Sequence, residues 1–286
     1  MSTSVLPAIA FRDLLVAFDF SDASEHALDY ARAIARQHNS RLLLVHVMEG
    51  RAPVTPGTEW VEEEAVRMAQ QVESTGAVLR EQGFAVEPLN LYGAIRERVQ
   101  ELVKAHNVDL IVAGTHAGEG LDRAIFGSNA EKLARSVDCP ALLIGPKCKS
   151  VQRLWELQRV LVATRLYPER ANIAIYAAQL AKINHAQLTV LHVAHPGQAY
   201  ERETWQAYLG EVAKESPETS ISERQQKVIL SKRHASEEIL TTANDWGADL
   251  IVMGASHDSL GMTHFRRGAL GEVLAEASCP VLAVRH

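Results

Sequence analysis

The segment Asp109-Leu110-Ile111-Val112-Ala113-Gly114 returns almost unchanged as Asp249-Leu250-Ile251-Val252-Met253-Gly254. The two stretches lie 140 residues apart (109 to 249). A solenoid unit has about 20–50 residues, whereas this spacing is the length of an ordinary domain. The chain of 286 residues is therefore a duplicated domain, with room for two cores, one in each copy.

Three further segments repeat in the same order. Cys139-Pro140-Ala141-Leu142 returns as Cys279-Pro280-Val281-Leu282, again at an offset of 140. The other two repeat at an offset of 146, and they are Leu14-Leu15-Val16-Ala17 with Val160-Leu161-Val162-Ala163, and Leu44-Val45-His46-Val47 with Val190-Leu191-His192-Val193. The middle of the second copy is therefore six residues shorter (146 against 140). We assign the two domains to residues 1–146 and 147–286.

Within each copy, short strand-like runs alternate with segments of helical periodicity, which predicts a parallel sheet covered on both faces. The strands expected in the first copy are 13–18, 41–47, 85–91, 109–113 and 141–144, and the helices are 23–37, 59–82, 95–106 and 129–136. The strands expected in the second copy are 159–164, 187–193, 226–231, 249–253 and 281–284. Right-handed crossovers favour the strand order 3-2-1-4-5. The predicted fold class is α/β, with two tandem Rossmann-like domains.

Composition narrows the classes of function. Hydrophobic residues make up 47% and charged residues 22%, as in globular proteins, and the net charge is −6. Residues 1–146 hold 13 basic and 20 acidic side chains, and residues 147–286 hold 16 and 15. Neither half has the basic character of a nucleic-acid binder, no apolar run reaches the ~18 residues of a membrane span, and no signal peptide is evident. We expect a cytoplasmic protein without nucleic-acid or membrane partners.

Cysteine and histidine usage gives no sign of a metal site. Cys139 and Cys279 precede equivalent apolar runs and are expected to be buried, whereas Cys148, in the connector 146–157, is expected to be exposed. No zinc-finger spacing is present. His192 is one of four histidines that could gather in the second copy, but its counterpart in the first copy is also a histidine, which favours a shared structural role.

In a sheet of this order, ligands bind outside the carboxyl ends of the first and fourth strands. In the first copy Asp19 follows the first strand and Gly114 ends the fourth, and Gly127-Ser128 then opens a helix. A helix N-terminus attracts phosphate, Gly127 permits close approach, and Ser128 can cap the helix. Asp19 could accept hydrogen bonds from an adenine amino group or from ribose hydroxyls. The alternative is that Asp19 and Ser128 are simply helix caps.

Taken together, these motifs resemble the universal stress protein family. The resemblance rests on Asp19 followed by Phe-Ser-Asp-Ala-Ser-Glu, on the Leu-Val-His-Val strand, on Gly-x-x-small-x9-Gly-Ser and on Cys-Pro, and it covers nearly the whole chain. Members of this family divide into ATP binders and non-binders. The resemblance implies ATP, with or without Mg²⁺, in the first copy. The residues that it implies for the nucleotide are Ala17, Phe18, Asp19, Val47, Gly114, Thr115, His116, Ala117, Gly127, Ser128 and Asn129.

The first copy departs from the binders' motif at one position. Ala117 stands where the motif has its second glycine, with Gly118 directly after it. If the backbone at that position needs positive φ, an L-residue costs about 1–2 kcal/mol. The cost is tolerable for the fold and would lower ATP affinity about tenfold.

The second copy departs at several positions of the same crevice. Arg165 replaces Asp19, Arg233 replaces Gly93, His257 replaces Ala117, and Arg267-Gly268 follows Arg266 where the first copy has Gly127-Ser128. One interpretation is a dead site filled by arginines paired with acidic neighbours, of which the candidates are Glu169, Asp258 and Glu272. The other is a reworked anion site formed by Arg165, Arg266 and Arg267.

Three classes of function remain. A nucleotide-binding regulatory protein fits the crevice of the first copy. A dedicated enzyme is not expected, since no Walker lysine or acidic pair accompanies the phosphate loop and His116 is the one nearby base, although slow ATP hydrolysis stays open. The third class is an assembly protein without nucleotide. The family pattern implies that the last strands, 141–144 and 281–284, pair as an intrachain pseudo-dimer, and that two chains could form a homodimer.

Overall fold

The computed structural model describes residues 9–49, 59–115, 128–151, 153–165, 171–194, 202–215, 226–255 and 268–285. The elements of the first copy are β1 (Asp13–Ala17), α1 (Asp22–His38), β2 (Arg41–Met48), α2 (Glu59–Glu81), β3 (Ala85–Tyr92), α3 (Ile95–His106), β4 (Leu110–Gly114), α4 (Ser128–Ser136) and β5 (Ala141–Ile144). Those of the second copy are β6 (Arg159–Ala163), α5 (Asn172–Ile183), β7 (Gln187–Ala194), α6 (Arg202–Glu215), β8 (Gln226–Leu230), α7 (Ala235–Trp246), β9 (Leu250–Ala255), α8 (Ala269–Glu276) and β10 (Val281–Arg285). The predicted elements are confirmed, with ends that differ by one residue in several places and by two at the end of β9.

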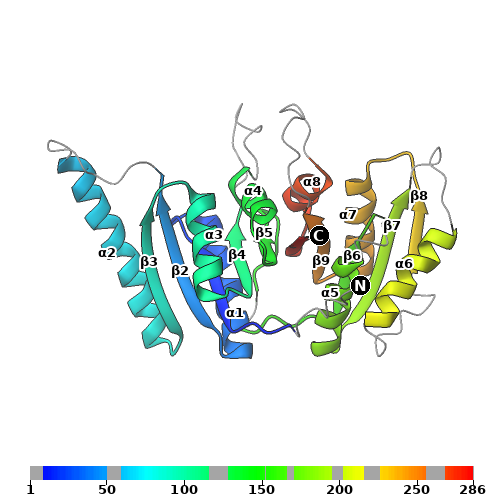
Figure 1. The fold of residues 1–286 in the computed structure, drawn as a ribbon, viewed down its shortest axis with the longest axis horizontal. Helices are drawn as coiled ribbons and strands as arrows, with labels where there is room; N and C mark the ends of the chain where they lie inside the picture. Colours follow the sequence, from blue (N-terminus) through cyan, green and yellow to red (C-terminus); the bar gives the residue numbers. More distant parts are fainter. Residues whose placement is uncertain are drawn as a thin grey trace.

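All ten strands form one sheet, in the order β3-β2-β1-β4-β5-β10-β9-β6-β7-β8 (Figure 1). Each copy has the predicted order 3-2-1-4-5, and its strands pair in parallel. The two copies meet at β5 and β10, which pair antiparallel with Leu142 opposite Leu282. This is the pairing expected for the two last strands, and it makes the chain an intrachain pseudo-dimer. Association of two chains into a homodimer stays a prediction.

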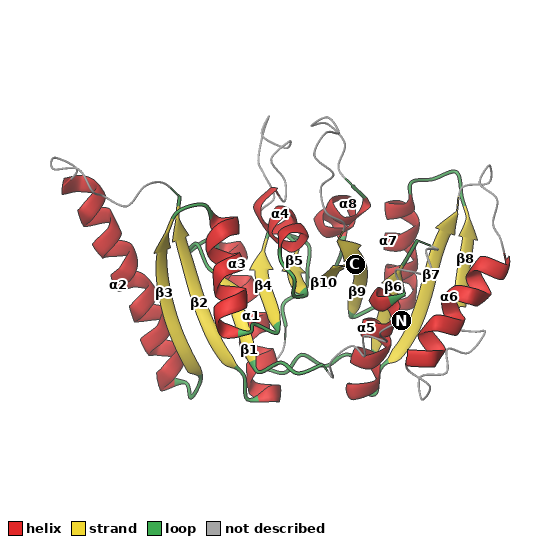
Figure 2. Cartoon of the chain, in the orientation of Figure 1, coloured by secondary structure: helices red, strands yellow, loops and turns green. Residues whose placement is uncertain are grey.

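The core is arranged by the faces of the sheet rather than by the copies, contrary to the expectation of one core per copy. One apolar cluster joins alternate strand residues to α1, α2, α5 and α6, and the other joins the intervening residues to α3, α4, α7 and α8 (Figure 2). Both clusters contain residues of both copies. The reason is the β5–β10 pairing, which continues the pleat from one copy into the other.

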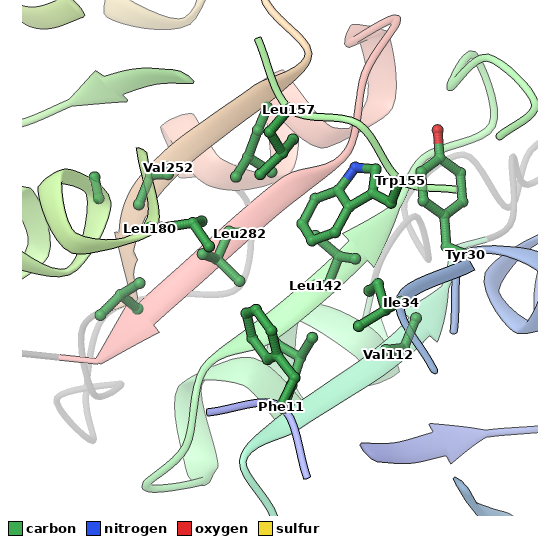
Figure 3. Packing of buried hydrophobic residues seen from close by; sticks show 14 of the residues in the cluster. Phe11, Tyr30, Ile34, Val112, Leu142, Trp155, Leu157, Leu180, Val252 and Leu282 are labelled. Atoms are coloured by element: carbon green, nitrogen blue, oxygen red, sulfur yellow. The ribbon is translucent and has the colours of Figure 1, made fainter. Parts of the chain in front are cut away.

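Large side chains fill the first cluster at the junction between the copies. Figure 3 shows Leu142 and Leu282 beside each other, with Trp155 of the connector close to Leu142. Trp155 and Leu157 are buried members of this cluster. The connector is therefore part of the core that joins the two copies.

The aspartate at the start of each Asp-Leu-Ile-Val repeat links two neighbouring strands through side-chain hydrogen bonds. One oxygen of Asp109, Oδ2, accepts hydrogen bonds from the backbone N–H groups of Arg12 and Asp13 at 2.7 and 3.0 Å. Asp249 Oδ2 accepts two equivalent bonds, at 3.0 and 2.9 Å, from the amides of residues 158–159. Each aspartate thus ties the start of the fourth strand of its copy to the start of the first.

Cys148 is buried, so the prediction of an exposed thiol was wrong. The connector turns back after β5, with the Cys148 N–H donating to the carbonyl of Gly145 at 3.1 Å. This turn places the thiol 3.3 Å from the hydroxyl of Tyr30 on α1. Cys139 and Cys279 are buried as expected. In the described ranges, no helix is both long and apolar enough to cross a membrane.

Candidate functional site

The chain leaves β1 of the first copy through a turn that is fixed by β2. The Phe18 N–H donates to the carbonyl of Val45 at 2.8 Å, and the Phe18 carbonyl accepts from His46 Nδ1 at 2.8 Å. In the second copy His192 Nδ1 lies 2.9 Å from the carbonyl of Thr164 in the same way. The repeated histidine therefore has the shared structural role that the sequence indicated. No cluster of three or more metal-ligating side chains suits a metal ion within the described residues.

Asp19 lies exposed directly beyond the carboxyl end of β1. Its Oδ1 accepts hydrogen bonds from the backbone N–H and the hydroxyl of Ser21, at 3.1 and 2.5 Å. Ser21 is the N-cap of α1 and accepts from the N–H of Ser24 at 3.2 Å. The alternative interpretation was that Asp19 caps the helix. The cap is instead Ser21, and Asp19 orients this residue. The same bonds fix the direction of its carboxylate.

Between these two residues, Phe20 holds a strained backbone conformation. Its φ is +64°, in the left-handed region that an aromatic L-residue rarely adopts. Its ring packs against the rings of Phe18 and His46, with centroids 5.0 and 5.1 Å away. Such strain costs about 1–3 kcal/mol and persists where the surroundings hold it. Here it lies in the turn between Asp19 and the N-cap Ser21.

Gly114 and Thr115, which the resemblance assigns to the phosphates, both have roles in the scaffold. A Cβ atom added to Gly114 would lie 2.0 Å from the carbonyl oxygen of Ala23, so only glycine allows β4 and the start of α1 to approach. The backbone N–H and the hydroxyl of Thr115 both donate to the Ile144 carbonyl, at 2.9 and 3.3 Å. The Thr115 side chain is buried. Their presence is therefore explained without a ligand.

Of the other residues predicted for the first copy, the structure describes some and not others. Ala17 and Val47 are half-buried near the carboxyl ends of the neighbouring strands β1 and β2. Ser128 and Asn129 begin α4. Three predicted residues of the first copy lie outside the described residues, namely His116, Ala117 and Gly127. The same holds for three predicted residues of the second copy, which are His257, Arg266 and Arg267.

The turn before the third helix also differs between the copies. Gly93 has a φ of +123°, which L side chains rarely adopt, and its N–H donates to the carbonyl of Met48 at 3.1 Å. In the second copy the corresponding bond is made by Ser231, whose N–H donates to the carbonyl of Ala194 at 3.0 Å, and the N–H of Arg233 donates to the Ser231 hydroxyl at 3.0 Å. Arg233 thus lies in a longer turn, 231–234 against 93–94 in the first copy.

The crevice of the second copy contains a cavity of about 300 Å³. Apolar side chains of β6, β7, β9 and α7 form much of its wall, and Arg165 and Gly268 also line it. Glu272, one of the acids offered as a partner for the arginines, instead accepts a hydrogen bond from the hydroxyl of Ser236. The other two candidate acids, Glu169 and Asp258, lie outside the described residues. The dead-site interpretation, with the arginines paired to acidic neighbours, therefore stays a prediction.

Two features of the second crevice were missed by reasoning from the sequence. Arg135, from α4 of the first copy, lines the cavity of the second copy. The sequence does contain a sign of this difference, because the equivalent position of the second copy, 140 residues later, is Ala275 and not an arginine. Tyr208 lies beside the crevice turn, its hydroxyl 2.9 Å from Thr164 Oγ1, and burial raises the pKa of Tyr208 to about 12.

Comparison with known proteins decides the family. The model of the universal stress protein family matches the chain twice, at residues 10–145 and 156–285. The chain belongs to the universal stress protein family. Both copies of the duplication are thus universal stress protein domains, as the motifs indicated.

The chain is similar to other proteins in sequence and in structure. "Universal stress protein A homolog 1" of Coxiella burnetii is 33% identical over 143 residues, which cover 98% of that protein and 48% of this chain. A universal stress protein of Archaeoglobus fulgidus DSM 4304 has a similar fold over 97% of this chain and 98% of its own, with a TM-score of 0.73 and 16% identity. A universal stress protein solved in complex with cAMP matches 46% of this chain and 98% of its own, with 18% identity and a TM-score of 0.36.

Proposed function

We propose that this universal stress protein is a regulatory protein that binds an adenine nucleotide, ATP in the first instance, in the crevice of its first copy. The observation that carries the proposal is the placement of Asp19 beyond β1, with its carboxylate oriented by Ser21. An acceptor fixed in this way suits an adenine amino group or ribose hydroxyls. The strained φ of Phe20 supports the proposal, because strain of this kind gathers at ligand sites.

The phosphates would lie toward the start of α4. The helix begins at Ser128, directly after Gly127, and its N-terminal amides carry the positive end of the helix dipole. The second copy has Arg165 in place of Asp19 and no serine at the start of its last helix. We therefore infer that the adenine nucleotide binds in one copy only.

An assembly function without nucleotide is the second candidate, and a specific observation favours it. The contact of Gly114 with the Ala23 carbonyl and the bonds of Thr115 to Ile144 account for two residues of the motif through packing alone. A dedicated enzyme is less well supported, because a hydrolase needs a group that activates water and commonly a metal at the phosphates.

Titration with ATP, with and without Mg²⁺, tests the proposal directly. We expect Asp19→Ala to lower the affinity for ATP about tenfold or more, since a hydrogen bond to a charged group contributes about 1.5–3 kcal/mol. Isothermal titration calorimetry measures this, and mass spectrometry of ligand released by heat identifies any nucleotide that copurifies.

Asp29→Ala is the matched control. Asp29 is an exposed aspartate on α1 that pairs with Arg32, so its loss should leave ATP affinity within about twofold of the wild type. Absence of both copurified nucleotide and ATP binding at millimolar concentration would support the assembly function instead. An Asp19→Ala titration equal to the wild type would show that the nucleotide lies elsewhere.

A further inference from the structure

The cavity in the second copy is built by both copies. Its wall contains residues of β6, β7, β9, α7 and α8 from the second copy, together with Arg135 from the last turn of α4 in the first. A Cβ atom added to Gly268 would lie 3.2 Å from Arg135 Nη2, so the guanidinium group lies directly against the start of α8. The β5–β10 pairing brings α4 and α8 together, and it therefore completes this cavity.

Among the described residues that line the cavity, the charged side chains are those of two arginines, Arg135 and Arg165. The carboxylate of Glu272, in the first turn of α8, accepts a hydrogen bond from the hydroxyl of Ser236. Gly268, the N-cap of α8, has no side chain to cap the helix, so the positive end of this helix adds to the charge of the two guanidinium groups. A negatively charged group is favoured here.

Most of the other described residues that line the cavity are apolar, and Thr164 adds a hydroxyl group. The apolar side chains are those of Ala163, Ile173, Leu191, Val193, Ala235, Ile239, Met253, Ala269 and Leu270. A volume of about 300 Å³ is at the small end of ligand pockets, which run from about 300 to 1,000 Å³. The kind of ligand that fits this cavity is thus a compact apolar molecule that carries one anionic group.

We propose that the second copy binds a small organic anion, with its apolar body against β7 and β9 and its phosphate or carboxylate group held by Arg165 and Arg135. Guanidinium groups bind such anions through charge-assisted, often bidentate hydrogen bonds. The site differs from the proposed nucleotide site because Arg165 stands where the first copy has Asp19. The first copy cannot have the same arrangement, because the residue of the second copy equivalent to Arg135 is Ala275, which carries no charge.

The test uses the full chain and phenyl phosphate as the probe, an aromatic ring with one phosphate group. We expect saturable binding by isothermal titration calorimetry, and a loss of about tenfold or more in affinity for Arg165→Gln and for Arg135→Gln. Phenol, which has the same ring without the charge, should bind at least about tenfold more weakly. Benzoate replaces the phosphate by a carboxylate, and the tighter of the two anions identifies the preferred group.

Two further variants separate the site from general effects. Arg12→Gln removes an exposed arginine just before β1 of the first copy, which is not among the described residues that line the cavity, and should leave the affinity for phenyl phosphate within about twofold. Ala269→Phe keeps both arginines but fills the cavity from the first residue of α8, and should abolish binding. Circular dichroism confirms that each variant is folded.

Several results would overturn the proposal. They are no saturable binding of phenyl phosphate at up to roughly 10 mM, equal binding of phenol, or unchanged affinity in folded Arg135→Gln. The result is independent of the proposed nucleotide site. Arg135→Gln should leave the ATP titration unchanged, and Asp19→Ala should leave that of phenyl phosphate unchanged, so either site can fail without the other.

Discussion

At the scale of single residues, burial decides the chemistry of the thiols and of the tyrosine beside one of them. Burial raises the pKa of Cys148 to about 11, and that of Cys139 and of Cys279 to about 12. It also raises the pKa of Tyr30, whose hydroxyl lies 3.3 Å from the thiol of Cys148 and donates to the carbonyl of Lys149 at 2.7 Å. The thiolate is the reactive form of cysteine, so the three thiols are structural groups.

The raised pKa values predict inert thiols and a loss of stability in alkali. At pH 8 a thiol of pKa about 11 is about one thousandth ionised, so we expect slow labelling of the folded chain by a thiol reagent and fast labelling in urea. The folded pKa lies above the ordinary value of 9.0, so the unfolded chain loses these protons first. The contribution of the protonated thiols to the free energy of unfolding should therefore have its full value below pH 9 and should fall as pH rises toward 11–12.

Urea unfolding at pH 7 and at pH 10 measures this dependence, with Cys148→Ala as the comparison. The variant should lose less stability between the two pH values than the wild type. Rapid labelling of Cys148 in the folded chain would contradict its burial.

At the scale of elements, close contacts at strand ends hold the helices and strands in register. Gly114 lets the end of β4 approach the carbonyl of Ala23 on α1, and Gly145 does the same toward the carbonyl of Leu274 on α8, with added Cβ atoms at 2.0 and 2.2 Å. Backbone atoms cannot move aside as a flexible side chain can. Glycine at these positions is thus a requirement of packing.

Replacement of Gly114 by alanine should therefore destabilise the fold. We expect Gly114→Ala to lower the free energy of unfolding by about 1–3 kcal/mol, the range for an overfilled core. Gly210 on α6 is the matched control, because an added Cβ there meets nothing within 4 Å. Gly210→Ala should raise stability by about 0.5–1 kcal/mol through helix propensity. Urea unfolding of both variants checks the opposite signs.

The repeated aspartates give a second prediction at this scale. Asp109→Ala removes the acceptor of two backbone N–H groups, so we expect a loss of about 2–4 kcal/mol in the free energy of unfolding. Asp249→Ala should give a similar loss, because its two bonds are equivalent. A loss below about 0.5 kcal/mol, the range of ordinary surface substitutions, would rule out the proposed tie between strands.

At the scale of the whole molecule, the two copies share their cores. We propose that the units of the duplication, residues 1–146 and 147–286, do not unfold independently. Both apolar clusters run through β5 and β10, and Trp155 of the connector packs into one of them near Leu142 (Figure 3). A change at the junction should therefore affect both halves.

Leu282→Ala tests this coupling. Leu282 is buried on β10 opposite Leu142, and its truncation should cost about 2–5 kcal/mol. Hydrogen exchange should show protection falling to a similar degree in β1 of the first copy and β7 of the second. Loss of protection confined to the second copy would mean that the copies are independent units.

The duplication, the strand order and the crevice at the carboxyl ends of the strands were predictable from repeated motifs, hydrophobic periodicity and the handedness of strand–helix–strand crossovers. The sequence also placed Asp19 at the end of the first strand. The tertiary structure decided the burial of Cys148, the packing roles of Gly114 and Thr115, and the approach of Arg135 to the other copy's crevice. These depend on contacts between segments far apart in the chain, and the approach of Arg135 also needs the pairing of β5 with β10.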